Sequence, residues 1–245
     1  MALILSINMV FTGCILTRIL CHNVKLIRIK KEKGICIEKR VILSKEELLD
    51  TIASEIIVCT KCRLSKARKN AVPGEGSPDS QIMFIGEGPG QREDIAGRPF
   101  VGQAGKFLDT LLSETCLVKR DTFICNIVRC RPPSNRQPLP DEIQACTPYL
   151  DRQMKAIQPK VIVTLGNCST GYVFSKANLR FTSMTQRHGR PYEKNILDMM
   201  VTVFPTYHPA AALYSAKYKE QLIEDFQMLR SELLKRGFLR RSSSQ

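Results

Sequence analysis

Side chains that could take part in catalysis follow three separate apolar runs of the sequence. A glycine-rich segment follows the run at 81–86, Asn126 lies within the run at 122–128, and His208 follows the run that begins at residue 200. An asparagine inside an apolar strand costs free energy to bury unless its amide is paired. A lone histidine is often only a satisfied structural residue, so its role depends on what lies near it.

The glycine-rich segment at 86–105 contains six glycines in 20 residues and precedes a helical pattern. A phosphate-binding loop is one interpretation, but neither GxGxxG nor GxxxxGK[ST] fits in the right place. Glycines also let a backbone approach a sugar-phosphate or a base closely.

Four of the ten cysteines form two distant pairs, C-x2-C at Cys59 and Cys62 and C-x15-C at Cys130 and Cys146. Two such pairs can assemble one tetrahedral site, although zinc ribbons usually have two tight knuckles. An iron–sulfur cubane takes four cysteines and tolerates dispersed ones. Ordinary buried thiols are the alternative, and that interpretation fits Cys125.

The elements that would position these residues alternate between strand and helix. Strands are expected at 81–86, 122–128, 160–166 and 200–209, and helices at 44–56, 102–114, 141–157, 168–176 and 217–237. Residues 131–140 are expected to form a loop because prolines interrupt them, and 177–199 a hairpin or loop. The pattern predicts an α/β fold, a three-layer sandwich with a four-stranded, mostly parallel central sheet flanked by helices.

Ligands of such sheets bind at the carboxyl ends of the strands. Residues 86–90, Asn126 and His208 all follow or end a predicted strand. We therefore expect the three segments to converge on one cleft.

The chain has 245 residues, of which 43% are hydrophobic and 24% charged, with a net charge of +14. This composition excludes a disordered, collagen-like or coiled-coil protein and favours a polyanionic partner. Residues 1–43 carry +6 and residues 230–245 carry +4, so the body is only mildly basic. Within the body, five basic residues oppose only Asp121 over 18 positions: Lys119, Arg120, Arg129, Arg131 and Arg136.

The apolar N-terminus at 1–17 has no positively charged start and no cleavage site of small residues, so it is a poor signal peptide. It is also short for a membrane span, which needs about 20 residues. We expect no membrane association. The predicted organisation is an extension at 1–43, a catalytic domain at 44–237 and a polar tail at 238–245.

Three motifs, GEGPGQREDIAGRPFVGQAG, NIVRCRPPSNRQP and TYHPAA, occur in this order. Together they resemble the family 4 uracil-DNA glycosylases, the iron–sulfur branch of that superfamily. The resemblance covers roughly 44–235. It implies an enzyme that hydrolyses the N-glycosidic bond of a flipped-out deoxyuridine in DNA, releases uracil and leaves an abasic site, the first step of base excision repair.

The resemblance also implies roles for individual residues. His208 would stabilise the departing base, and Glu87 and Gly88 would lie at the attacking water. Substrate-binding residues would be Asn126 for the base edge, Phe100 as an exposed aromatic floor, Glu93 near the C5 edge, and Asn135. Enzymes of family 1 have an acidic residue where this chain has Gly88, so general base catalysis should matter less here.

The cysteine pairs fit the same resemblance, which implies a structural 4Fe-4S cluster on Cys59, Cys62, Cys130 and Cys146. Free thiolates imply a reducing compartment, here a cytoplasm of prokaryotic type. Basic side chains are candidates for phosphate contacts: Arg129, Arg131, Arg136 and Lys217. We expect a monomer that does not cut the strand, because the motifs offer no lysine for a Schiff base.

Three other interpretations remain open. A relative with the same fold could act on other deaminated bases or hold abasic DNA covalently. A cluster-bearing module could bind nucleic acid without catalysis. A membrane-anchored electron carrier would leave the glycine-rich loop and the HPAA motif unexplained.

Overall fold

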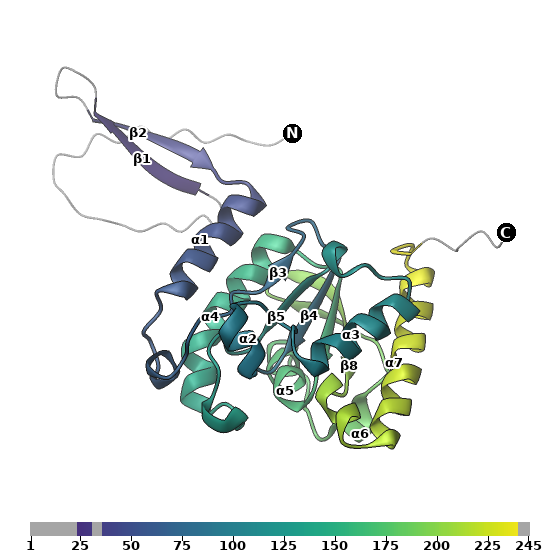
Figure 1. The fold of residues 1–245 in the computed structure, drawn as a ribbon. Helices are drawn as coiled ribbons and strands as arrows, with labels where there is room; N and C mark the ends of the chain where they lie inside the picture. Colours follow the sequence, from purple (N-terminus) through teal and green to yellow (C-terminus); the bar gives the residue numbers. More distant parts are fainter. Residues whose placement is uncertain (1–23, 31–35, 240–245) are drawn as a thin grey trace. The chain divides into compact units, whose positions relative to one another are not determined.

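The computed structural model describes residues 24–30 and 36–239 (Figure 1). The chain divides into two compact units, one that ends at Ser44 and one that begins at Lys45. In the first unit, β1 (Val24–Lys30) pairs antiparallel with β2 (Cys36–Ile42). The apolar run at 1–17 lies outside the described residues.

The second unit is built on a six-stranded sheet in the order β3-β5-β4-β6-β8-β7. Its four central strands are parallel: β5 (Phe123–Asn126), β4 (Ile82–Gly86), β6 (Val161–Leu165) and β8 (Met199–Thr206). The edge strands β3 (Glu75–Gly76) and β7 (Tyr192–Ile196) are antiparallel to their neighbours. The predicted α/β sandwich is therefore confirmed, but the predicted count of four strands is wrong.

The two missed strands lack the signals that identify a buried strand. β3 has only two residues, and β7 alternates between exposed and partly buried positions. Such polar edge strands are held by main-chain pairing rather than by an apolar run. β7 and β8 form the hairpin expected as one option for 177–199, and the short helix α6 (Met184–Arg187) precedes it.

Helices cover both faces of the sheet, as Figure 1 shows. One core packs α1 (Lys45–Ile57), α4 (Pro140–Ile157) and α5 (Asn167–Lys176) on the sheet. The other packs α3 (Gln103–Glu114) and α7 (Ala216–Lys235) on the opposite face. Along β4, Met83 and Ile85 enter the first core while Ile82 and Phe84 enter the second, which is the alternation of a strand buried on both faces.

The loops at the carboxyl ends of the strands carry short helical segments. α2 (Gln91–Ala96) follows β4, and a 3-10 turn at Pro209–Leu213 follows β8. The loop predicted at 131–140 contains a 3-10 turn at Pro133–Asn135, and α4 begins at its last residue because proline suits the first helical position.

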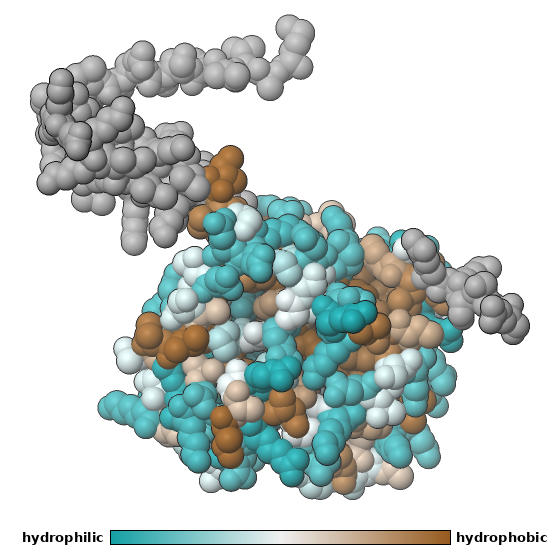
Figure 2. Space-filling view, turned by 45° about the horizontal axis from the view of Figure 1, so that its top comes forward, coloured by the Kyte–Doolittle hydropathy of each residue, from teal (hydrophilic) through white to brown (hydrophobic). Residues whose placement is uncertain are grey.

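The face shown in Figure 2 is mainly hydrophilic, with hydrophobic residues in scattered patches. None of the helices in residues 24–30 and 36–239 is both long and apolar enough to cross a membrane.

A close backbone approach holds the loop before α3. A Cβ atom on Gly105 would lie 1.8 Å from the carbonyl oxygen of Phe100, whose φ is +51°. On Gly171, inside α5, the nearest neighbour would be a ring atom of Phe181 at 3.7 Å, an ordinary contact.

Gly105→Ala should therefore lower the free energy of unfolding by about 1–3 kcal/mol, because a backbone segment must move. Gly171→Ala is the matched control and should raise that free energy, by up to about 1 kcal/mol, because alanine favours a helix interior. Denaturant unfolding of both variants measures the difference, and a Gly105→Ala protein as stable as the original would contradict the close approach.

Candidate active site

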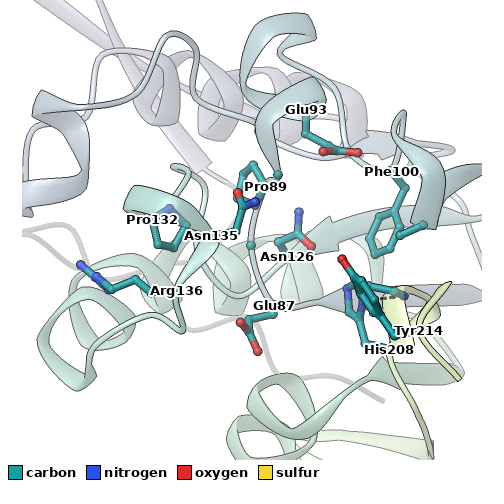
Figure 3. Close-up of a pocket in the computed structure, with 14 residues that line it drawn as sticks. Glu87, Pro89, Glu93, Phe100, Asn126, Pro132, Asn135, Arg136, His208 and Tyr214 are labelled. Atoms are coloured by element: carbon teal, nitrogen blue, oxygen red, sulfur yellow. Dashed lines mark hydrogen bonds between the residues drawn. The ribbon is translucent and has the colours of Figure 1, made fainter. Parts of the chain in front are cut away.

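A cavity of about 350 Å³ opens at the carboxyl ends of the central strands (Figure 3). It brings together segments that follow β4, β5 and β8, as the sequence predicted. All seven candidate catalytic and substrate-binding residues line it: Glu87, Gly88, Glu93, Phe100, Asn126, Asn135 and His208. In Figure 3, Asn126 lies near the middle of this group.

Asn126 is the last residue of β5 and only 2% of it is exposed. Its side-chain oxygen Oδ1 is buried and has no hydrogen-bond partner among the described residues. An unpaired buried carbonyl costs about 1–3 kcal/mol. This oxygen is therefore placed to accept a hydrogen bond from a ligand that enters the cavity.

Gly86 makes room for that amide, since it pairs with Asn126 across β4 and β5. A Cβ atom on Gly86 would lie 2.4 Å from Oδ1 of Asn126 and 2.8 Å from Cζ of Phe100. No side chain larger than hydrogen fits there without displacing both groups. The sequence analysis places Gly86 at the end of a strand and at the cleft, but it does not show that this glycine makes room for the amide.

Phe100 lines the cavity but is 5% exposed, so the prediction of an exposed ring is wrong. Its ring stacks on that of His208, with centroids 5.7 Å apart and an angle of 27° between the planes. The ring belongs to the core that α3 and α7 form on the sheet, and it lies beside Gly86. A ligand in the cavity could therefore contact only one face of the Phe100 ring.

His208 precedes the 3-10 turn, and the N–H of Ala210 donates to its Nδ1 at 3.1 Å. Nδ1 is therefore an acceptor, and the ring proton lies on Nε2. Burial lowers the pKa of His208 to about 4, although the nearby Glu93 carboxylate raises it. The imidazole is neutral near pH 7 and offers one N–H donor.

The position of His208 depends on Gly166, which follows β6. Gly166 has a φ of +95°, and a Cβ atom there would lie 3.1 Å from the Cβ of His208. Its N–H also donates to the carbonyl of Thr206 at 2.9 Å. Glycine at this point lets the segment after β8 pack directly on the end of β6.

Glu87 and Gly88 follow β4 at the cavity. Burial raises the pKa of the Glu87 carboxyl above its ordinary value. A Cβ atom on Gly88 would lie 2.8 Å from Cγ2 of Val128, so the lack of a side chain here is also a packing requirement. No hydrogen bond within the described part of the chain occupies the Glu87 carboxylate.

Glu93 lies in α2 and is held in place by main-chain donors. Its Oε1 accepts hydrogen bonds from the N–H groups of Val101 at 3.0 Å and Gly102 at 2.7 Å. The carboxylate therefore ties α2 to the loop before α3 and keeps a fixed orientation in the cavity wall.

The candidate phosphate-binding residues differ in their surroundings. Arg136 lines the cavity, but its guanidinium donates to both oxygens of the buried Glu142, at 2.9 and 2.6 Å. Arg131 donates through Nε to Oδ1 of Asn135 at 2.8 Å. Lys217 is exposed in the first turn of α7.

Arg129 cannot contact a phosphate at the surface, because it is 1% exposed. Its Nη2 donates to Oε1 of Gln153 in α4. The prediction of a DNA contact at Arg129 is wrong, because a run of basic residues in sequence does not distinguish a buried guanidinium from a solvated one.

A second, smaller pocket contains all four predicted ligand cysteines, Cys59, Cys62, Cys130 and Cys146. They are free thiols from the segments that follow α1 and β5 and from α4. Nη1 of Arg68 donates to the sulfur of Cys130 at 2.9 Å, and the N–H of Arg129 to that of Cys146 at 3.2 Å.

Burial raises the pKa of Cys146 to about 11, although Arg129 lowers it. Such a thiol becomes a thiolate readily only beside a strongly positive centre. Within residues 36–239, no group of three or more histidine, cysteine and acidic side chains is closed tightly enough to hold a single metal ion. Four cysteines that line one pocket are the donor set that a 4Fe-4S cluster takes, so the residue types fit such a cluster.

Pro89 and Gly90 of the cavity wall belong to the segment 86–90 that the sequence places at the cleft. The sequence analysis did not identify four other residues of the wall, Ala104, Pro132, Ala210 and Tyr214. Tyr214 is 89% exposed at the end of the 3-10 turn after His208. The HPAAALY motif was the available signal, but only its first residues were interpreted.

Comparison with known proteins identifies one matching family model and several similar chains. Residues 73–229 match the family model of the Uracil DNA glycosylase superfamily. The chain is 53% identical over 186 residues to a type-4 uracil-DNA glycosylase of Saccharolobus solfataricus, covering 76% of this chain and 86% of that protein. For proteins of the same name the identity is 53% in Sulfurisphaera tokodaii, covering 74% and 83% of the two chains, and 43% in Archaeoglobus fulgidus, covering 75% and 92%.

The protonation of His208 can be measured directly by NMR of its ring nitrogens. We expect a neutral ring with the proton on Nε2 from pH 8 to below pH 5, and a midpoint near pH 4 rather than the ordinary 6.5. Glu93→Gln should lower that midpoint further, because it removes the negative charge that favours the protonated ring. A midpoint near 6.5, or a proton on Nδ1, would contradict the burial and the contact with Ala210.

Proposed function

The chain belongs to the uracil DNA glycosylase superfamily, and on that premise we propose that it is a type-4 uracil-DNA glycosylase. It hydrolyses the bond between N1 of uracil and C1′ of deoxyribose in DNA, releases uracil and leaves an abasic site. The observation that carries the proposal is the buried, unpaired Oδ1 of Asn126 in the same cavity as the neutral His208.

Recognition of the base is the task of Asn126. Its Oδ1 accepts the N3–H of uracil, and the amide nitrogen donates to O4. Cytosine has an acceptor at N3 and a donor at N4, so the same amide would leave groups unpaired at about 1–3 kcal/mol each. This discrimination requires the amide to keep one orientation in the cavity, where it lies beside Gly86.

Exclusion of thymine rests on shape, since thymine differs from uracil only by the C5 methyl group. We assign this role to Glu93, whose carboxylate is fixed by the N–H groups of Val101 and Gly102. Phe100 supplies the aromatic face against which the base lies, an interaction worth about 1–3 kcal/mol per base.

Breakage of the bond sends its electron pair into the uracil ring, and negative charge develops at O2. The Nε2–H of His208 donates to that oxygen as the charge appears, which stabilises the transition state more than the ground state. The Ala210 N–H on Nδ1 keeps the proton on the correct nitrogen.

The sugar becomes positive as uracil departs, and a water molecule adds its oxygen to C1′ and releases one proton. Glu87 lies in the cavity with a free carboxylate that can orient this water and accept the proton. Asn135 lies in the same wall. With Gly88 in place of a second acid, most of the rate enhancement should come from stabilisation of the leaving base.

Contacts with the DNA backbone fall to the exposed basic groups near the cavity. Arg131 and Lys217 remain candidates, whereas Arg136 is paired with Glu142 and helps to hold the loop at 131–140.

We also propose that Cys59, Cys62, Cys130 and Cys146 hold a 4Fe-4S cluster. All four line one pocket, and two of their sulfurs accept hydrogen bonds from Arg68 and from the backbone of Arg129. When bound, such a cluster supplies a cross-link between loops and the capacity for one-electron transfer. Here the cysteines would connect the segment after α1 to α4 and to the segment after β5, beside the loop at 131–140.

A cluster on free thiolates requires a reducing compartment, and we propose the cytoplasm. The monomeric state expected from the sequence stays a prediction.

The activity is tested with a labelled oligonucleotide that contains one deoxyuridine. Release of free uracil, with strand cleavage only after alkali, is the expected result for a monofunctional enzyme. Matched strands with cytosine, thymine or hypoxanthine at the same position distinguish uracil from other bases. Binding without release of any base would contradict the proposal, and so would nicking without alkali.

His208→Ala should lower kcat by about 10²–10³, the usual loss when one transition-state donor is removed. Glu87→Gln should lower kcat by about tenfold, because glutamine still orients water but does not accept its proton. Single-turnover rates at saturating enzyme measure both, with thermal unfolding to confirm that each variant folds. An equal or greater loss for Glu87→Gln would refute this division of roles.

Cys146→Ser should remove most of the bound iron and the visible absorbance of the purified protein, because the fourth ligand is lost. Cys116→Ser is the matched control, since Cys116 is exposed and does not line the thiol pocket. Iron per chain is the measurement, and full retention of iron by Cys146→Ser would exclude this residue as a ligand.

A further inference from the structure

Arg129 is among the largest fully buried side chains of the described residues, with 1% of it exposed. Only its Nη2 has a hydrogen-bond acceptor, the neutral amide oxygen of Gln153. Its Nε and Nη1 are buried without partners, and none of the ion pairs among residues 36–239 includes it. A buried guanidinium in this condition is costly unless an anion reaches it.

Gln153 fixes the orientation of the Arg129 guanidinium. Gln153 accepts from the guanidinium and donates through Nε2 to the carbonyl of Pro73 at 2.9 Å. This arrangement holds the guanidinium in the wall of the thiol pocket. Arg129 thus stays in the wall of the pocket that the four cysteines line, with two of its guanidinium nitrogens unpaired.

Two further basic residues line the same pocket, and its lining contains no carboxylate. Arg68 donates through Nη1 to the sulfur of Cys130 at 2.9 Å and through Nη2 to the carbonyl of Ile57 at 2.7 Å. Lys61 lies over the ring of Tyr149, with Nζ 4.6 Å from the centroid. The pocket therefore favours a group with net negative charge.

Four thiolates carry more negative charge than the core of a 4Fe-4S cluster offsets, so the complete centre is an anion. We propose that Arg129 and Arg68 are the cations that balance this charge and thereby set the reduction potential of the centre. The proposal rests on the cluster under Proposed function. It gives Arg129 a role beside that cluster in place of the DNA contact, which its burial excludes.

The direction of the effect follows from charge. Addition of an electron makes the centre more negative, and a nearby guanidinium stabilises that state more than the oxidised one. Removal of either guanidinium should therefore make reduction less favourable and shift the potential to more negative values. Removal of a distant surface charge should change it little, because solvent and salt screen it.

The test uses the cluster-containing enzyme and three charge-removing variants, Arg129→Gln, Arg68→Gln and Arg190→Gln. Arg190 is exposed and outside the thiol pocket, so it is the matched control. Arg129→Lys and Arg68→Lys keep the charge. Midpoint potentials are measured in a mediated titration with dithionite as the electron donor, and iron per chain is measured on the same samples.

We expect Arg129→Gln and Arg68→Gln each to reduce the equilibrium constant for one-electron reduction at least tenfold, about 59 mV more negative. The lysine variants should recover most of that shift, and Arg190→Gln should match the unchanged enzyme. If Arg129→Gln does not fold or loses its iron, Arg68→Gln and the two lysine variants still decide the question.

Potentials of Arg68→Gln and any folded Arg129→Gln equal to that of Arg190→Gln, with full iron, would overturn the proposal. An unchanged enzyme that contains no iron would instead refute the cluster itself. Release of uracil is assayed separately, so the glycosylase activity is tested independently of the cluster and of its reduction potential.

Discussion

The rest of the site depends on a buried amide whose oxygen has no hydrogen-bond partner among the described residues. Asn126 occupies the last position of β5, and parallel pairing places it beside Gly86, the last residue of β4. Only glycine at that neighbour leaves space for the amide and for the ring of Phe100. The sheet therefore keeps an unsatisfied acceptor rigid at its carboxyl edge, and its desolvation cost is recovered only when a base with a matching donor enters.

The same stretch of chain serves two sites. Beyond β5, the N–H groups of Ile127 and Val128 donate to the carbonyls of Gly86 and Glu87, so the segment stays fixed to the glycine-rich loop. Three residues after Asn126 the chain reaches Arg129 and then Cys130, in the wall of the thiol pocket. The short segment from Asn126 to Cys130 thus lines the cavity at one end and the thiol pocket at the other.

Much of this was predictable from the sequence because the signals were local. Apolar runs that end at Gly86, contain Asn126 or precede His208 located three of the four central strands, and the rule for parallel sheets brought their ends together. What failed depended on contacts between distant segments. Arg129 has the sequence signature of a surface residue, and only the packing of α4 and its Gln153 buries it. Phe100 is buried in the core that α3 and α7 form on the sheet, and β7 is defined by its pairing with β8.

The hydrogen bond that sets the tautomer of His208 comes from the main chain at Ala210, not from a neighbouring side chain. A substitution at position 210 therefore keeps this hydrogen bond whatever the side chain, and only the space in the cavity wall limits its size. Proline is the one exception. Proline has no N–H, so it would release the imidazole to adopt the other tautomer. Among descendants of this sequence, residue 210 should drift among small side chains while proline stays absent, a pattern that no contact of the side chain itself would explain.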